Sequence, residues 1–297
     1  MRVTSNTFPQ SLIDHLRGLS SRLGSLQNQT ATGQRITLPE DDPIAVARVM
    51  DLRESKSLLA QYERNAARAS NINTTSIAGV RSLINLSDRA GEIAVLGKDL
   101  MGQDAANAYA AELDQLIEQA FQDGNLKFAG ESVFGGTIGA SNPFEPTRDG
   151  DGRIIAVTNT GMTEGATFQI SEGTELSPFT TSEENDGIAI FIDRLISLRN
   201  ALETGSDDAV RAAGAELGKS EDDLLVMLSG LGAVQMRIEV ESARNATQYG
   251  ELDTEISRQV DVDLAESLVE LGRVETAYQA ALQSSARILN LSLFDFL

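Results

Sequence analysis

The side chains that could do chemistry are few and scattered. His15 is the only histidine in 297 residues, and there is no cysteine. A Ser/His/Asp triad needs its histidine in a pocket beside a nucleophile, whereas His15 lies between Asp14 and Leu16 in a stretch with helical spacing. One histidine without cysteine is also a poor basis for a zinc site. We therefore expect His15 to be a surface or interface residue.

Two other segments could bind a ligand. Residues 149–152 (Asp-Gly-Asp-Gly) have the alternating carboxylates of a calcium loop. They lack its later glycine and glutamate, so a hairpin turn is the favoured interpretation. Residues 134–137 (Phe-Gly-Gly-Thr) are glycine-rich, but no lysine follows as in a phosphate loop. The sequence therefore predicts no catalytic, cofactor-binding or metal-binding residues, and a protein that is not an enzyme.

The charge of the chain excludes further classes. The formal net charge is −20, which argues against nucleic acid and against an anionic membrane surface, because both bind clustered lysine and arginine. There is no apolar run of about 18 residues that could span a membrane, and residues 1–6 do not resemble a cleaved signal peptide. These criteria predict a cytoplasmic protein unless an export route without a cleaved signal operates.

Two apolar seams with heptad spacing lie at opposite ends of the chain. In both, the steps alternate between three and four residues, which keeps the side chains on one narrow face of a helix. A narrow seam cannot bury itself, so each needs a partner helix from the other end of the chain or from another copy. The N-terminal seam is Leu12, Leu16, Leu19, Leu23 and Leu26, and the C-terminal seam is Leu271, Val274, Tyr278, Ala281, Ser285 and Ile288.

The proline distribution predicts long helices. The tracts 44–142 and 179–297 contain no proline, and proline costs about 3 kcal/mol inside a helix. Asp42 is expected to cap a helix that begins at Pro43 and has apolar residues from Ile44 onward. The expected helices are about 5–31, 43–96, 104–123, 185–203, 207–248 and 251–290, and the expected strands are 153–158 and 166–171.

These elements predict a mainly α fold with a small β-rich insert. The long helices from both termini are expected to run antiparallel in a coiled coil or bundle. We predict three domains: residues 1–42 with 252–297 as a terminal coiled coil, residues 43–130 with 185–251 as a helical bundle, and residues 131–184 as the β-rich outer insert.

The motifs that flank the seams resemble those of the bacterial flagellin superfamily, and within it the hook–filament junction family of hook-associated proteins. The N-terminal motif comprises Gly33, Arg35, Ile36, Asp41, Asp42 and Pro43. The C-terminal motif comprises Asp263 and Ala265, and the chain then ends with Leu291, Leu293, Phe294 and an Asp-Phe-Leu tripeptide. The Asp-Asp-Pro and Leu-Phe-Asp sequences favour the junction family over flagellin itself.

The resemblance implies a structural role outside the cell. Members of that family leave through the flagellar type III export apparatus, with a dedicated chaperone on the C-terminal segment. They assemble between the first hook-associated protein and the flagellin filament as a closed ring, of about eleven copies. The two seams, together with Leu291, Leu293 and Phe294, would then form the assembly interface.

Two alternatives remain open from the sequence. The chain could be flagellin, the filament subunit. It could also be a surface module that binds a glycan or another ligand through the β-rich insert. That function needs an exposed aromatic pocket, and beyond Phe134 at its N-terminal edge the insert has only Phe144, Phe168 and Phe179 as aromatic residues.

Overall fold

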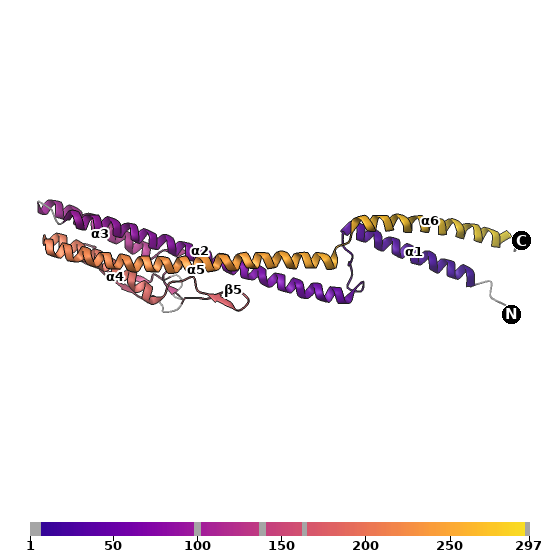
Figure 1. Ribbon diagram of the computed structural model, residues 1–297, viewed down its shortest axis with the longest axis horizontal. Coiled ribbons are helices and arrows are strands. Elements are labelled where there is room, and N and C mark those ends of the chain that lie inside the picture. The colour runs from indigo at the N-terminus through magenta and orange to yellow at the C-terminus, as the bar shows by residue number, and fades with distance from the viewer. Residues whose placement is uncertain (1–6, 98–101, 137–140, 162–164, 295–297) are drawn as a thin grey trace. The chain divides into compact units, whose positions relative to one another are not determined.

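The computed structural model describes residues 7–97, 102–136, 141–161 and 165–294 (Figure 1). The fold is mainly α with short antiparallel strand pairs, as predicted. The chain divides into two compact units: residues 1–58 with 249–297 (unit 1), and residues 59–248 (unit 2). The helices are α1 (Thr7–Thr32), α2 (Pro43–Gly97), α3 (Gln103–Gly124), α4 (Ser182–Thr204), α5 (Asp207–Val260) and α6 (Leu264–Phe294).

The largest difference from the predicted helices is the position of one break. The sequence predicts a break near residues 249–250, which is wrong, because α5 continues to Val260 and α6 begins at Leu264. Gly250 lies inside α5, where a glycine costs only about 1 kcal/mol. The break is set by Asp263, whose Oδ1 accepts hydrogen bonds from the amides of Ala265 (2.9 Å) and Glu266 (3.2 Å) and so caps α6.

Other helix starts follow the expected capping chemistry. Asp42 Oδ1 accepts from the Ala45 amide at 3.1 Å, with Pro43 as the first residue of α2. This confirms the predicted cap, in which proline occupies the position where its missing N–H costs nothing. Thr181 and Glu184 form a reciprocal capping box at the start of α4.

Unit 2 is a bundle of neighbouring helices around one large core. Ser87 Oγ on α2 donates to Glu221 Oε2 on α5 at 2.7 Å, and Arg89 Nε on α2 pairs with Glu112 Oε1 on α3 at 2.7 Å. The core between these helices excludes water, which is the main source of folding free energy. Its largest fully buried side chains include Leu83, Ile93, Leu113, Ile117, Phe134, Phe144, Phe191, Ile192 and Leu195.

The β segments of unit 2 are hairpins, not one sheet. The pairs are β1 (Lys127–Phe128) with β2 (Glu131–Ser132), β3 (Phe144–Arg148) with β4 (Ile154–Asn159), and β5 (Phe168–Ser171) with β6 (Thr174–Leu176). The segment 149–152 joins β3 to β4, which confirms the hairpin interpretation of its Asp-Gly-Asp-Gly sequence. The β5–β6 hairpin packs Ile170 and Leu176 against α2 and α5, in a smaller core with Ala66 and Ile238.

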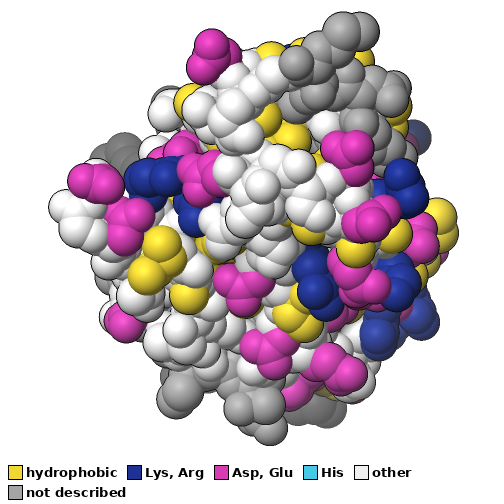
Figure 2. Space-filling model, turned by 90° about the vertical axis from the view of Figure 1, so that its left-hand side faces the viewer, with side chains coloured by type: hydrophobic (Ala, Val, Ile, Leu, Met, Phe, Trp, Pro, Cys, Tyr) yellow, Lys and Arg dark blue, Asp and Glu magenta, His cyan; other side chains and the backbone are white. Residues whose placement is uncertain are grey.

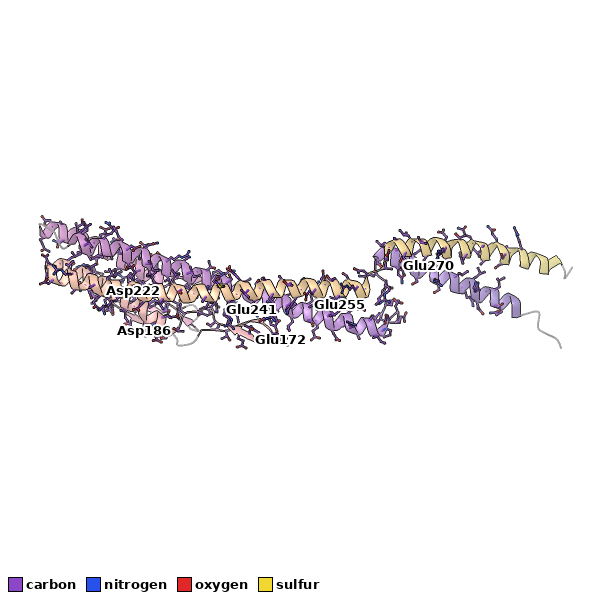
Figure 3. The ribbon with its side chains drawn as sticks, in the orientation of Figure 1. Glu172, Asp186, Asp222, Glu241, Glu255 and Glu270 are labelled. Atoms are coloured by element: carbon purple, nitrogen blue, oxygen red, sulfur yellow. The ribbon has the colours of Figure 1, made fainter. Side chains whose placement is uncertain are left out.

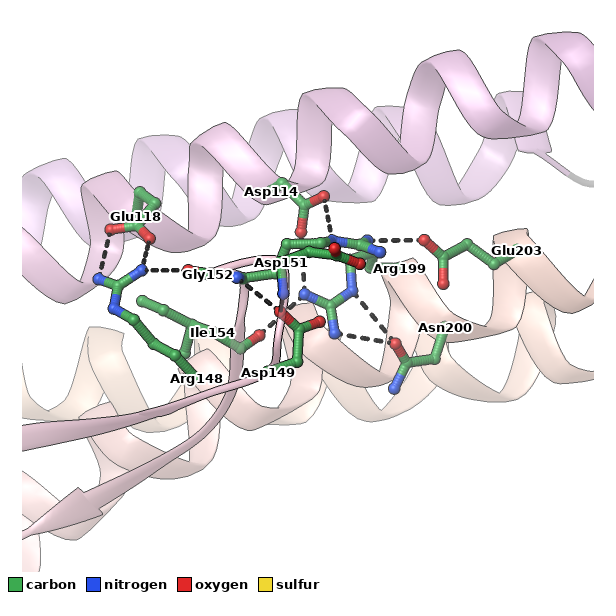
Figure 4. Close-up of polar contacts among 11 residues, drawn as sticks. Asp114, Glu118, Arg148, Asp149, Asp151, Gly152, Ile154, Arg199, Asn200 and Glu203 are labelled. Carbon is green, nitrogen blue, oxygen red and sulfur yellow. Dashed lines mark hydrogen bonds and ion pairs between the residues drawn. The ribbon is translucent and has the colours of Figure 1, made fainter.

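A buried arginine fixes the β3–β4 hairpin to the bundle (Figure 4). Arg199 on α4 is only 3% exposed, and its Nη1 donates to Asp114 Oδ1 on α3 (2.9 Å) and to the carbonyl of Ile154 on β4 (2.8 Å). Arg153 Nε donates to the other oxygen of Asp114 at 2.8 Å, and its Nη2 donates to Glu203 Oε1 at 2.6 Å. Asp114 therefore compensates two cations, one of which has almost no access to water.

We predict that Asp114 stabilises unit 2 far more than Glu203 does. Asp114→Asn leaves Arg199 buried without its counter-charge, so the free energy of unfolding should fall by about 3 kcal/mol. Glu203→Gln removes only the more exposed half of the network and should cost less than about 1 kcal/mol. Urea unfolding followed by circular dichroism measures both, and equal losses would contradict the assignment.

Candidate functional site

The terminal helices form an antiparallel pair in unit 1 (Figure 1). Arg22 Nη2 on α1 contacts Glu270 Oε1 on α6 at 2.7 Å, and the amide of Val262, just before α6, bonds to Gly33, just after α1. The residue numbers run in opposite directions, as the sequence predicts for helices from the two termini.

The predicted seams lie along this pair but are incompletely covered. On α1 all five leucines are half-buried, whereas the helix residues between them are mostly exposed. On α6, Val274 and Ser285 are buried, while Leu271, Tyr278 and Ala281 are half-buried. The side chains of Ile288, Leu291, Leu293 and Phe294 lie outside the described residues. A half-buried leucine seam retains apolar area that a further partner could cover.

Helix α6 also exposes large apolar side chains in the turns before the predicted seam. Leu268 is 55% exposed, Val269 is 59% exposed, and Leu264 is 48% exposed. Leu264 lies one heptad before Leu271 and so extends the seam, whereas Leu268 and Val269 lie off its line, so a search for a single seam does not find those two. A helix with apolar residues on several faces is typical of one that is buried in an assembly.

A short backbone pairing, which we call the clasp, joins residues 33–35 to residues 260–262. The amide of Arg35 donates to the carbonyl of Val260 at 2.6 Å, and the amide of Val262 donates to the carbonyl of Gly33 at 3.0 Å. Gln34 and Asp261 form an isolated antiparallel bridge between these bonds. Gly33 has a φ of +72°, a left-handed conformation that glycine adopts at low cost. The clasp therefore holds together the two places where α1 and α5 end.

Arg35 extends the clasp through its side chain. Its Nη2 donates to the carbonyl of Gln259 at 3.0 Å, and its Nη1 lies 3.4 Å from Asp42 Oδ2. The other oxygen of Asp42 caps α2. Ile36 is buried beside these polar contacts. The motif residues Gly33, Arg35, Ile36 and Asp42 thus lie together with structural roles.

Asp41 organises the loop that precedes α2. Its Oδ2 accepts hydrogen bonds from the amides of Leu38 (2.8 Å) and Thr37 (3.0 Å), and from Thr37 Oγ1 (3.2 Å). The hydrogen bonds from these two amides lower the pKa of Asp41 below its ordinary value.

Ala265 is an exposed residue in the first turn of α6 and contributes its amide to the cap that Asp263 provides.

Acidic side chains are distributed along the chain (Figure 3). Two of them in unit 1 are Glu255 on α5 and Glu270 on α6. Acidic and basic side chains are interspersed on the face shown in Figure 2. Among the described residues, no group of three or more histidine, cysteine, aspartate or glutamate side chains could hold a metal ion. His15 is exposed on α1.

The described helices include no segment that is both long and apolar enough to cross a membrane. In the insert, Phe144 is fully buried and Phe168 and Phe179 are half-buried against the core. The insert therefore uses these aromatic side chains for packing.

Comparison with known proteins identifies the fold and the motifs. Residues 3–138 match the bacterial flagellin N-terminal helical region, and residues 217–297 match the bacterial flagellin C-terminal helical region. The chain belongs to the bacterial flagellin superfamily.

Relatives within the superfamily include hook-associated proteins. Flagellar hook-associated protein 3 of Salmonella typhimurium is 22% identical in an alignment 327 positions long, which covers 99% of each chain. The crystal structure of Bacillus cereus FlgL aligns with a TM-score of 0.60 at 19% identity, over 70% of this chain and 99% of that one. The flagellar junction protein FlgL of Legionella pneumophila aligns with a TM-score of 0.55 at 10% identity, over 72% and 99% of the two chains.

We predict that Gly33→Ala weakens the clasp. A Cβ at a φ of +72° costs about 1–2 kcal/mol, so the terminal pair should become more sensitive to proteolysis at low protease concentration. Gly18→Ala is the matched control: Gly18 lies inside α1, and no atom lies within 4 Å of the position that a Cβ would take. Alanine there should stabilise the helix by about 1 kcal/mol. Equal behaviour of the two variants would contradict the role of Gly33.

We also predict a pH transition in the loop before α2. Because the folded pKa of Asp41 lies below its ordinary 3.8, its stabilising contribution is complete above that value and disappears as the pH falls through the lower folded pKa. The amide resonances of Thr37 and Leu38 should report a midpoint below 3.8, which Asp41→Ala abolishes. A midpoint at or above 3.8 would be evidence against this role.

Proposed function

We propose that this chain is a non-enzymatic structural adaptor of the bacterial flagellum, placed at the junction between hook and filament. The observation that carries the proposal is the antiparallel pair of terminal helices with incompletely buried seams, held by a clasp of motif residues. Such a pair has little use in a monomer, because its apolar surface needs another partner. The full-length similarity to a protein named flagellar hook-associated protein 3 supports the junction over the filament.

We further propose how the chain reaches and occupies this place. It leaves the cell through the flagellar type III apparatus, with an export chaperone on its C-terminal segment. Outside the cell it assembles as a ring between the first hook-associated protein and flagellin. The absence of cysteine from the chain fits an export route of this kind, since no disulfide has to form or break. The residues proposed for the assembly interface are the two seams with Leu291, Leu293 and Phe294.

Deleting the gene distinguishes an adaptor from a filament subunit. Cells without an adaptor should remain able to make and export flagellin, so monomers should accumulate in the medium and filaments should be absent. Cells without their only filament protein have no monomers to release. Immunoblots of culture medium for flagellin, with electron microscopy of the cells, measure the difference. An absence of released flagellin in the deletion strain would contradict the adaptor function.

Truncation tests whether the terminal pair carries the function. A chain without residues 1–30 or without residues 268–297 retains all of unit 2, so it should remain folded by circular dichroism and fail to restore filament growth. The seam variant Leu19→Asp/Leu23→Asp should fail in the same way, because charge on the seam opposes apolar pairing. The matched control is Ser20→Asp/Ser21→Asp, which places the same charges at exposed positions of α1. Restoration of filaments by either truncated chain would refute this assignment.

A further inference from the structure

The loop before α2 presents apolar side chains to solvent. Ile44, in the first turn of α2, is 84% exposed, and Leu38 in the loop is 52% exposed. The other face of the same helix turn is buried, with Ala45 at 7%. Full burial of one isoleucine or leucine is worth about 1.5–3 kcal/mol, so leaving both exposed is a cost unless another surface covers them.

The loop is also held in place. The Asp41 carboxylate bonds to the amides of Thr37 and Leu38, and Asp42 caps α2 beside Arg35. Leu38 and Ile44 therefore flank an ordered turn, so little conformational entropy would be lost when they dock. We call Leu38, Ile44 and the exposed Glu40 between them the knob.

Helix α6 carries a shallow, mainly apolar groove between exposed side chains on the side away from α1. The groove is shallow and open to solvent, and Val269, 59% exposed, is the largest apolar side chain among its described lining residues. Val274 and Tyr278, which pack toward α1, do not line it. The groove is lined by Val269, Gly272, Arg273, Thr276, Ala277 and Ala280.

The charges of the two surfaces are complementary. Among the described residues that line the groove, Arg273 is the only charged one; its side chain is 77% exposed and its Nη1 lies 3.9 Å from Glu270 Oε2. Glu40 is exposed in the knob, and no ion pair involves it among the described residues. In a chain with a net charge of −20, a groove whose only charge is positive favours an acidic apolar partner.

We propose that the knob of one copy docks in the α6 groove of a second copy, with Ile44 against Val269 and Ala277 and Glu40 near Arg273. This proposal rests on the proposed function, because it supplies a contact between copies in the assembly. The contact joins two different surfaces, so each copy can bind one neighbour through its knob and another through its groove. Contacts of this head-to-tail kind generate rings or helices rather than closed dimers.

Cross-linking tests the contact in flagella. The chain contains no cysteine, so Ile44→Cys/Ala277→Cys has only the two introduced thiols, and a short bis-maleimide can join them. We expect a ladder of covalent dimers, trimers and larger species in flagella isolated from cells that carry this variant. The matched control is Ile44→Cys/Glu275→Cys: residue 275 is exposed on the same turn of α6 but lies about 200° from residue 277 around the helix.

Charge exchange provides a second, independent readout. Glu40→Arg and Arg273→Glu, each added to the cysteine pair, should lower the yield of the ladder about fivefold, and the two together should restore it. A ladder that is as strong with Glu275→Cys, a product that stops at dimers, or no product would each overturn the proposal. Should Ile44→Cys not be incorporated, Leu38→Cys takes its place.

The cross-linking experiment separates this proposal from the adaptor function. Restoration of motility by the unmodified chain in cells that lack the gene tests the adaptor function alone. Restoration without a ladder would overturn the knob-and-groove contact and leave the adaptor function standing. Failure of the unmodified chain to restore filaments would overturn the adaptor function itself.

Discussion

The architecture of unit 1 depends on the backbone pairing between residues 33–35 and 260–262. Two long helices, α1 and α5, end within a few residues of this point, and α2 and α6 begin shortly after it. Each break exposes backbone groups that would otherwise be unpaired. The clasp satisfies several of them mutually, and Asp42 and Asp263 satisfy others by capping the two helices that follow. The two breaks therefore stabilise one another, and neither could move along the chain without disrupting the other.

The two units differ in how completely they bury their apolar side chains. In unit 2, residues such as Leu83, Phe134 and Ile192 have no exposed area, so this unit has a core within one chain, although Val226 (72%) and Met236 (67%) on α5 lie in solvent. In unit 1 the α1 leucines remain half-buried, and Ile44 and Val269 lie largely in solvent. Since burial of apolar area is the main stabilising term, unit 1, which has no large buried core of its own among the described residues, can gain stability from a neighbouring copy. The difference lies in the cores: unit 2 has a large one, whereas the terminal helices of unit 1 have only a seam that is mostly half-buried.

Whether a structural feature can be predicted from the sequence depends on how far apart in the chain the interacting residues lie. Helices and caps are local, so the α2 start at Pro43 and the leucine spacing in α1 could be predicted from residues a few positions apart. The clasp joins residues more than two hundred positions apart through backbone atoms, which leave no side-chain pattern. The break between α5 and α6 depends on the same backbone pairing, so the sequence before Asp263 does not reveal it. The sequence instead predicts the break near Gly250, which lies inside α5. An apolar pattern also does not show which of its residues are buried: Ile44 fits the apolar pattern of α2 but lies in solvent.

The net negative charge of the chain limits association through the exposed apolar side chains of unit 1. A net charge of −20 makes separate copies repel one another, and each apolar contact that unit 1 can offer is small, so two free copies gain little by meeting. Repulsion between exposed charges is screened beyond about 8–10 Å at physiological salt, while apolar contacts add with every neighbour. Association should therefore be weak in pairs and strong once several copies are aligned on an existing template. The acidity and the exposed apolar residues thus act together: they favour association on an existing template over aggregation in solution.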